Sequence, residues 1–237
     1  MNVGTKPLAH PNAVATTRAL RYRGAMDTDE PDVPLTDKPD KETDAPLLGS
    51  RFADALTFTH TLHRHQIRKG STTPYISHLL AVAGLCLEHG GDEDTAIAAL
   101  LHDSVEDQGG LPVLADIRER FGARVGHIVL GCSDSTADKG AMKPPWRLRK
   151  QRYLKHFEHD ADQDVRLVSM CDKLHNCRTT VSDLYEQGLS TFDKFNATRE
   201  DIVWFYRAFS DLAQRIHPGP LANDLNRVVS ELERLAG

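Results

Sequence analysis

The sequence has few cysteines, and none of them forms a pair typical of metal binding. Only four are present, Cys86, Cys132, Cys171 and Cys177, and no two have C-x-x-C spacing. Three fall in apolar helical patterns, where a free thiol behaves as a small hydrophobic residue. This pattern excludes a zinc ribbon and a disulfide framework. It favours a reducing, cytoplasmic setting.

Long apolar runs and an excess of positive charge are also missing. No stretch approaches the roughly 18 apolar residues that a membrane-spanning helix needs, so we expect no membrane partner. The 237 residues include 34 acidic and 29 basic side chains, for a formal net charge of −5. This balance argues against stable binding of nucleic acid by the chain as a whole. Any role with nucleotides must therefore come from a local patch.

Alternating strand patterns and repeats of fixed period are absent from the sequence. From Ser50 onward, apolar residues recur at spacings of three and four, which is typical of helices. Among the expected elements are a helix over 51–70 that stops at Gly70 and one continuous helix over 92–107. The sequence predicts an all-α domain, a bundle of about eight to ten helices.

The first 48 residues differ in composition from the rest of the chain. They include an acidic, proline-rich stretch over 26–46 and few large apolar side chains. Such a segment buries too little surface to offset its ordering entropy. We therefore predict a disordered leader over 1–48, or translation that begins near Met26. The folded domain covers 49–237, with the motifs in 51–184 and further helices in 185–237.

One segment, AALLHDSVEDQGG over 98–110, places charged groups directly after an apolar run. It holds His102, Asp103, Glu106 and Asp107. Burying such groups without partners costs several kcal/mol each, roughly. A divalent cation removes this cost, because it neutralises carboxylates and accepts the imidazole lone pair. The segment therefore predicts a metal site at the end of a buried helix.

Other helices must supply the remaining ligands of this site. His78 in PYISHLLAVA and Asp172 in SMCDKLHN are polar residues set in apolar helical patterns. Together with His102 and Asp103 they form a set of two imidazoles and two carboxylates, which suits Mn²⁺, with Fe²⁺ and Zn²⁺ as alternatives. Four protein ligands on a six-coordinate ion leave positions for water and a substrate oxygen. A water with a lowered pKa is a nucleophile near neutral pH.

The pattern of His78, His102–Asp103 and Asp172 resembles the HD-domain metal-dependent phosphohydrolases. The segments RKGSTTPYISHLLAVA, IAALLHDSVED and CDKLHNCRT resemble in particular the hydrolase domain of the RelA/SpoT family, and its small alarmone hydrolases of the metazoan SpoT homologue type. The resemblance covers about residues 51–184. It implies an HD-type helical bundle and Mn²⁺-dependent hydrolysis of the 3′-pyrophosphate of (p)ppGpp, which yields pyrophosphate and GDP or GTP.

The resemblance also implies roles for individual residues. It assigns the four ligands named above to the metal. It assigns Glu106 and Asp107 to the acidic pair that orients and activates the attacking water. The expected nucleotide contacts are Arg68 and Lys69 beside the base, and Asn176, Arg178 and Thr179 at the nucleoside. Spacings of four and three also place Asp172, Asn176 and Thr179 on one helix face.

A basic segment distinguishes this chain from the long bifunctional members of that family. Residues 139–155 contain no acid and seven basic side chains: Lys139, Lys143, Arg147, Arg149, Lys150, Arg152 and Lys155. A patch of this kind suits a small phosphorylated nucleotide, which it binds through charge-assisted hydrogen bonds. We assign Lys143, Arg147 and Lys150 to the 5′-phosphate side. Gln108 also replaces the Thr that many bifunctional members carry.

Other interpretations use the same residues. Another nucleotide phosphohydrolase, such as an NADPH phosphatase or a nucleotidase, fits the same scaffold. A nucleotide-sensing module that binds without cleaving is a further alternative, which the complete ligand set disfavours. The histidines of HTLHRH, residues 60–65, do not share one helix face, so we expect them to be surface residues without a ligand role. The oligomeric state is not predicted.

Overall fold

The computed structural model describes residue 1 and residues 47–134 and 144–237, and the account below concerns the unit Ala45–Gly237. The predicted leader over 1–48 lies almost wholly outside the described residues, and so does Lys143. The proposed boundary near residue 49 therefore stays a prediction.

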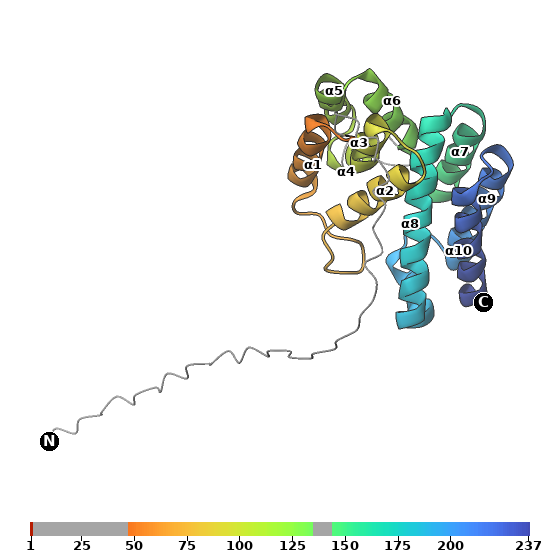
Figure 1. Cartoon of the computed structure of the whole chain (residues 1–237). Helices are drawn as coiled ribbons and strands as arrows, with labels where there is room; N and C mark the ends of the chain where they lie inside the picture. The colour runs from red at the N-terminus through yellow and green to blue at the C-terminus, as the bar shows by residue number, and fades with distance from the viewer. Residues whose placement is uncertain (2–46, 135–143) are drawn as a thin grey trace, which may run out of the picture. The chain divides into compact units, whose positions relative to one another are not determined.

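The described residues are mostly helical (Figure 1). The elements are α1 (Ser50–His63), α2 (Ile76–Glu88), α3 (Glu93–Leu101), α4 (Ser104–Gln108), α5 (Gly110–Phe121), α6 (Ala123–Cys132), α7 (Trp146–His159), α8 (Gln163–Gln187), the 3₁₀ helix η1 (Gly188–Lys194), α9 (Arg199–Ile216) and α10 (Pro220–Ala236). Across these ranges the β structure is one isolated bridge between Ile67 and Pro74. The all-α prediction is confirmed. None of these helices combines the length and apolarity that a membrane crossing requires.

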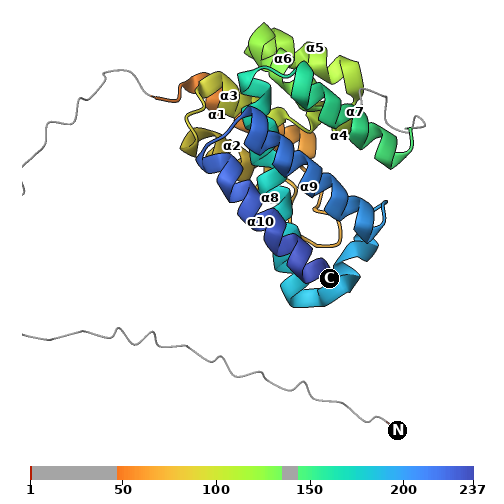
Figure 2. The ribbon, with the colours of Figure 1, turned by 90° about the vertical axis from the view of Figure 1, so that its right-hand side faces the viewer.

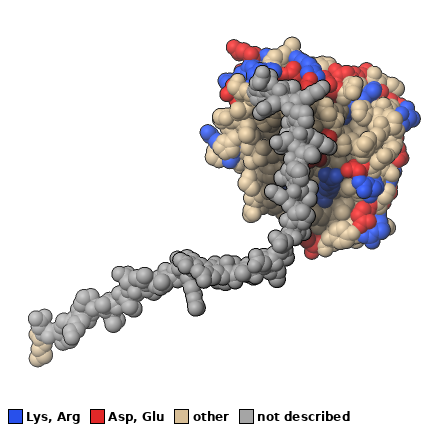
Figure 3. All heavy atoms as spheres, viewed as in Figure 1, with Lys and Arg blue, Asp and Glu red and all other residues tan. Residues whose placement is uncertain are grey.

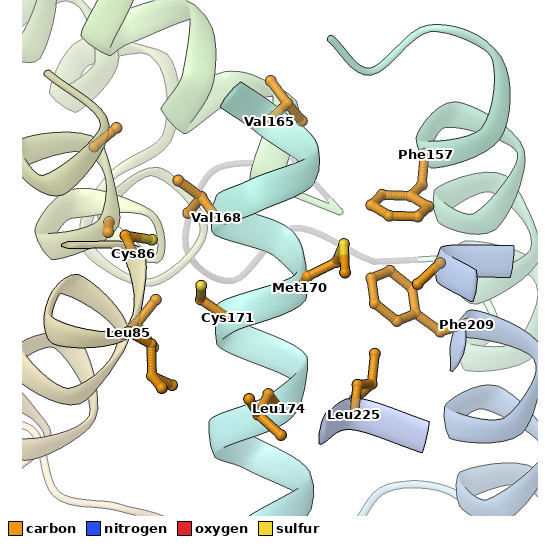
Figure 4. Packing of buried hydrophobic residues seen from close by; sticks show 14 of the residues in the cluster. Leu85, Cys86, Phe157, Val165, Val168, Met170, Cys171, Leu174, Phe209 and Leu225 are labelled. Atoms are coloured by element: carbon orange, nitrogen blue, oxygen red, sulfur yellow. The ribbon is translucent and has the colours of Figure 1, made fainter. Parts of the chain in front are cut away.

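Helix α8 is packed on two sides, and this fixes its position. On one side Cys171 faces Cys86 of α2, and on the other Met170 faces Phe209 of α9 (Figure 4). Figure 2 shows α8, α9 and α10 running side by side. Burial of one large apolar side chain is worth about 1.5–3 kcal/mol. The middle of α8, which carries Asp172, is therefore held within a packed core.

Helix α3 lies in the interior, so the residues at its end are buried. Every residue from Thr95 to Leu101 is buried. Its first turn is closed by Asp92, whose carboxylate accepts a hydrogen bond from the Thr95 N–H at 3.0 Å. Such an N-cap is worth about 1 kcal/mol. Since α3 is buried from Thr95 onward, the chain arrives at His102 inside the domain.

Two predicted helices are shorter than the sequence indicated. The helix expected over 51–70 ends at His63, and Arg68 lies in a loop closed by its N–H donating to the Thr73 carbonyl at 2.8 Å. Gly70 has φ +77°, in the left-handed region that favours glycine, so this tight turn interrupts the apolar periodicity.

The helix expected over 92–107 is also interrupted, at His102–Asp103, and forms α3 and α4 instead. The Nδ1 atom of His102 bonds the Ala99 carbonyl at 2.8 Å. In a continuous helix that carbonyl accepts the Asp103 N–H. A side chain bonds that carbonyl at this point, where the helix is interrupted.

Acidic and basic side chains are interspersed over the visible part of the face in Figure 3. The near balance of charge in the whole sequence is therefore also present locally on that face.

Candidate metal centre

Three parts of the fold bring four predicted ligands together. His78 lies in the first turn of α2, His102 and Asp103 form the junction between α3 and α4, and Asp172 lies on α8. His78 Nε2 is 3.2 Å from Asp172 Oδ1 and 3.5 Å from Asp103 Oδ2. His102 Nε2 is 3.1 Å from Asp103 Oδ2 and 3.6 Å from Asp172 Oδ1. The ligand atoms of His78, His102 and Asp103 lie within 4.8 Å of one another.

The chemistry of these atoms fits a divalent cation. His78, His102 and Asp172 are 0%, 2% and 4% exposed. The Nε2 atoms of both histidines are buried, and neither makes a hydrogen bond of good geometry within the described residues. An unsatisfied buried polar atom costs about 1–3 kcal/mol. A cation among the four side chains would satisfy both nitrogens and neutralise both carboxylates.

The Nδ1 atoms of His102 and His78 each make a hydrogen bond. His102 Nδ1 bonds the Ala99 carbonyl, which only accepts, so Nδ1 carries a proton. In the neutral ring, the form that a bound cation would require, the lone pair is then on Nε2. His78 Nδ1 lies 2.8 Å from Nδ1 of His175. Burial, His78 and Arg68 lower the pKa of His175 to about 4, so His175 is neutral near pH 7.

Electrostatic interactions within the cluster shift the pKa values of its side chains. Burial opposes ionisation of Asp172, yet Lys173 and His102 keep its pKa well below the usual range. Burial lowers the pKa of His102, but Asp103 and Asp172 raise it well above its ordinary value. The two carboxylates are therefore ionised at neutral pH. They attract positive charge to the point where the imidazoles meet.

Further side chains hold the carboxylates in place. The Tyr75 hydroxyl donates to Asp103 Oδ2 at 2.6 Å. The Asn176 amide and the Lys173 ammonium group both bond the Asp172 carboxylate. Arg68 in turn donates to Asn176 Oδ1 at 2.7 Å. Tyr75 and Lys173 were not singled out from the sequence, although each adjoins a predicted motif.

The acidic pair of α4 lies next to this cluster. Asp107 Oδ2 accepts a hydrogen bond from Gln66 at 2.8 Å. Glu106 interacts with the carboxyl group of Asp134. Burial raises the pKa of Asp134, but Lys150 and Arg149 lower it to about 2.

One histidine differs from its predicted setting. His63 was expected at the surface, but it is 2% exposed. Its ring bonds Gln66 Oε1 at 2.7 Å and the Ser104 hydroxyl at 3.1 Å. These bonds connect the end of α1 with α4, which lies forty-one residues further along the chain. His63 therefore supports the residue that holds Asp107. His60 and His65 are exposed, as predicted.

A cavity of about 640 Å³ adjoins the cluster, within the size range of small-molecule sites. The predicted substrate contacts among its lining residues are Arg68, Lys69, Lys150, Asn176 and Thr179. The lining also includes Lys173, Lys194, the acidic Asp183 and Glu186, and the aromatic Trp146 and Phe205. Lys194 belongs to η1, an element too short to show a periodic pattern in the sequence.

Two predicted contacts lie outside this cavity, because their guanidinium groups are engaged elsewhere. Arg147 pairs with Asp201 and stacks over the Trp204 ring at 4.2 Å. Arg178 points to Asp224 at 3.5 Å, and its side chain is 44% exposed. The structure therefore separates Arg147 from Lys150, although both belong to the basic segment.

A family model described as an HD domain matches residues 55–203. The chain belongs to the HD-domain family. The predicted family is thus confirmed, and HD domains are associated with a bound divalent metal. The matched range includes all four clustered ligands.

Curated relatives and solved structures agree with this assignment. A guanosine-3′,5′-bis(diphosphate) 3′-pyrophosphohydrolase, MESH1, from Xenopus tropicalis is 39% identical over 128 residues, which are 53% of this chain and 66% of the relative. The bifunctional (p)ppGpp synthase/hydrolase SpoT of Escherichia coli is 33% identical over 131 residues, 54% of this chain and 18% of the relative. The chain thus matches two thirds or less of the length of these relatives.

A solved structure shows the same fold. It is described as a metazoan ortholog of SpoT that hydrolyzes ppGpp, and it superposes with a TM-score of 0.64 at 24% identity. The superposition covers 79% of this chain and 98% of that one.

The cluster geometry predicts the effect of removing one carboxylate. In an Asp103→Asn variant, we expect the bound divalent metal to fall to background, because an amide cannot neutralise the ion and two buried imidazoles then share one carboxylate. Metal content by mass spectrometry after loading with Mn²⁺ tests this. Asp116→Asn, at an exposed position of α5, is the control and should keep the wild-type content. Full occupancy in Asp103→Asn contradicts the assigned centre.

Proposed function

We propose that the protein is a Mn²⁺-dependent phosphohydrolase that cleaves the 3′-pyrophosphate from (p)ppGpp, yielding pyrophosphate and GDP or GTP. One observation carries the proposal: the cluster of four ligands adjoins a cavity lined by basic side chains. Tyr75, Lys173, His175 and Asn176 each line this cavity and each contact one of the four ligands. The printed names of the relatives supply the substrate class.

The ligand set favours Mn²⁺ as the ion. Two imidazoles and two carboxylates form a mixed nitrogen and oxygen site, for which Mn²⁺ and Fe²⁺ are suited and Zn²⁺ is an alternative. When bound, such an ion lowers the pKa of a water and neutralises charge on phosphoryl oxygens. The ligands proposed are His78, His102, Asp103 and Asp172.

The chain's own residues orient the reactants. Arg68, Lys69 and Lys150 line the cavity and give it the positive charge that phosphate oxygens require. Glu106 and Asp107 are assigned to the attacking water, whose proton they accept. Gln66 holds Asp107 from behind at 2.8 Å, so its carboxylate stays oriented. Asn176 and Thr179 are assigned to the nucleoside.

A panel of nucleotides tests the proposed reaction. We expect ppGpp and pppGpp, incubated with the protein and Mn²⁺, to yield GDP and GTP with one pyrophosphate per turnover. Anion-exchange chromatography separates these products. Release of the 2′-phosphate from NADPH, or of orthophosphate from nucleoside monophosphates, with ppGpp left intact would overturn the substrate assignment. Tight binding of ppGpp without any product would favour a sensing module.

The assignment of Glu106 predicts a loss of turnover with the metal retained. Glu106→Gln should lower kcat about 10²- to 10⁴-fold, the usual contribution of a general acid–base group. The Mn²⁺ content should not change, because Glu106 is outside the ligand set. Glu119→Gln, at an exposed position of α5, is the matched control. A Glu106→Gln enzyme with normal kcat contradicts the assigned role.

The cavity also distinguishes Lys150 from Arg147, although the sequence analysis assigned both to the 5′-phosphate side. Lys150→Ala should raise KM about ten-fold or more, since a hydrogen bond to a charged group is worth about 1.5–3 kcal/mol. Arg147→Ala should change KM little, because that side chain pairs with Asp201 and is not among the residues that line the cavity, whereas Lys150, which pairs with Asp134, lines it. Steady-state kinetics on ppGpp measures both. Equal effects in the two variants would contradict this difference.

A further inference from the structure

The rings of His78 and His175 form a direct contact between the ligand cluster and the cavity. Their Nδ1 atoms are 2.8 Å apart, and the ring centroids are 4.8 Å apart at an interplanar angle of 40°. Two imidazole nitrogens at this distance share one proton, because two N–H groups repel and two lone pairs do not attract. One ring donates and the other accepts.

The position of the shared proton follows from the opposite side of His78. Its Nε2 atom is buried, faces Asp172 at 3.2 Å and Asp103 at 3.5 Å, and makes no hydrogen bond of good geometry. If Nε2 is a metal ligand, a neutral His78 must carry its proton on Nδ1. His175 Nδ1 is then the acceptor, and its proton is on Nε2.

The two metal-facing histidines are therefore oriented in different ways. The Ala99 carbonyl orients His102, and no substitution of a side chain removes a backbone carbonyl. A side chain orients His78. That side chain comes from α8, three residues after Asp172, so the helix that supplies one ligand also places the acceptor for another (Figure 1).

We propose that His175 is a positioning residue that fixes the Nδ1–H tautomer of His78 and thereby the affinity of the centre for its cation. This inference rests on the proposed metal centre. Since His175 also lines the cavity, its remaining ring nitrogen is the polar group that it offers to a bound nucleotide. Occupation of the cavity and occupation of the metal centre are thus connected through one ring.

Two substitutions separate the acceptor role of His175 from its size. His175→Phe keeps an aromatic ring of similar volume but has no acceptor. We expect its dissociation constant for Mn²⁺ to rise about 10- to 100-fold, the usual effect of losing a hydrogen-bond partner of a ligating histidine. His175→Asn places an amide oxygen where Nδ1 lay. It should bind Mn²⁺ within about three-fold of the wild-type constant.

The measurement is calorimetric titration of Mn²⁺ alone into the metal-depleted full chain, with circular dichroism to verify that each variant is folded. His217→Phe, a partly buried histidine beyond α9, is the matched control and should leave the constant unchanged. Because the readout is metal binding and not turnover, it is independent of the substrate assignment.

The outcomes distinguish this inference from the proposed function. Wild-type affinity in His175→Phe overturns the role of His175 and leaves the centre intact. Binding in His175→Asn that is as weak as in His175→Phe also overturns it, because the acceptor atom then does not matter. A wild-type protein that takes up no Mn²⁺ overturns the centre itself and this inference with it.

Discussion

The Nε2 atoms of His78 and His102 are buried beside two ionised carboxylates, and the surrounding fold holds them there. Bringing such groups out of water is costly unless they are paired. The packing of α3 and α8 provides the opposing free energy, because both helices are enclosed by apolar side chains. The same packing fixes the ligand positions before any ion arrives. A stable core and an organised centre are therefore consequences of one arrangement.

The helical class was predictable because periodicity is a local property. Helix α9, Arg199–Ile216, is one example, and its Thr198 cap is local as well. The four candidate ligands could also be named from the sequence, because each lies in a short and distinctive segment. Their approach to within 3.1–3.6 Å depends on how α2, α3 and α8 pack, and that follows from contacts between distant parts of the chain.

The features that the sequence did not predict have two causes. Some side chains compete with the backbone for hydrogen bonds of a helix, and others contact residues that are distant in the chain. The His102 ring takes a backbone carbonyl and interrupts a helix whose apolar pattern is continuous. His63 is buried, and its ring hydrogen-bonds the hydroxyl of Ser104, a residue distant in the chain. Arg147 and Lys150 are three residues apart on α7, and both are basic. Asp201 and Trp204 of α9 engage Arg147, whereas Lys150 pairs with Asp134 and lines the cavity.

The side chains around the candidate metal centre connect it with the neighbouring cavity. Tyr75, Asn176 and His175 each contact one ligand of the centre and also line the cavity. Under the proposed function, a nucleotide that contacts these side chains would change the hydrogen bonds available to the candidate ligands. An ion that fixes the ligands likewise fixes the side chains that the nucleotide meets. Thermodynamic linkage requires the two effects on affinity to be equal.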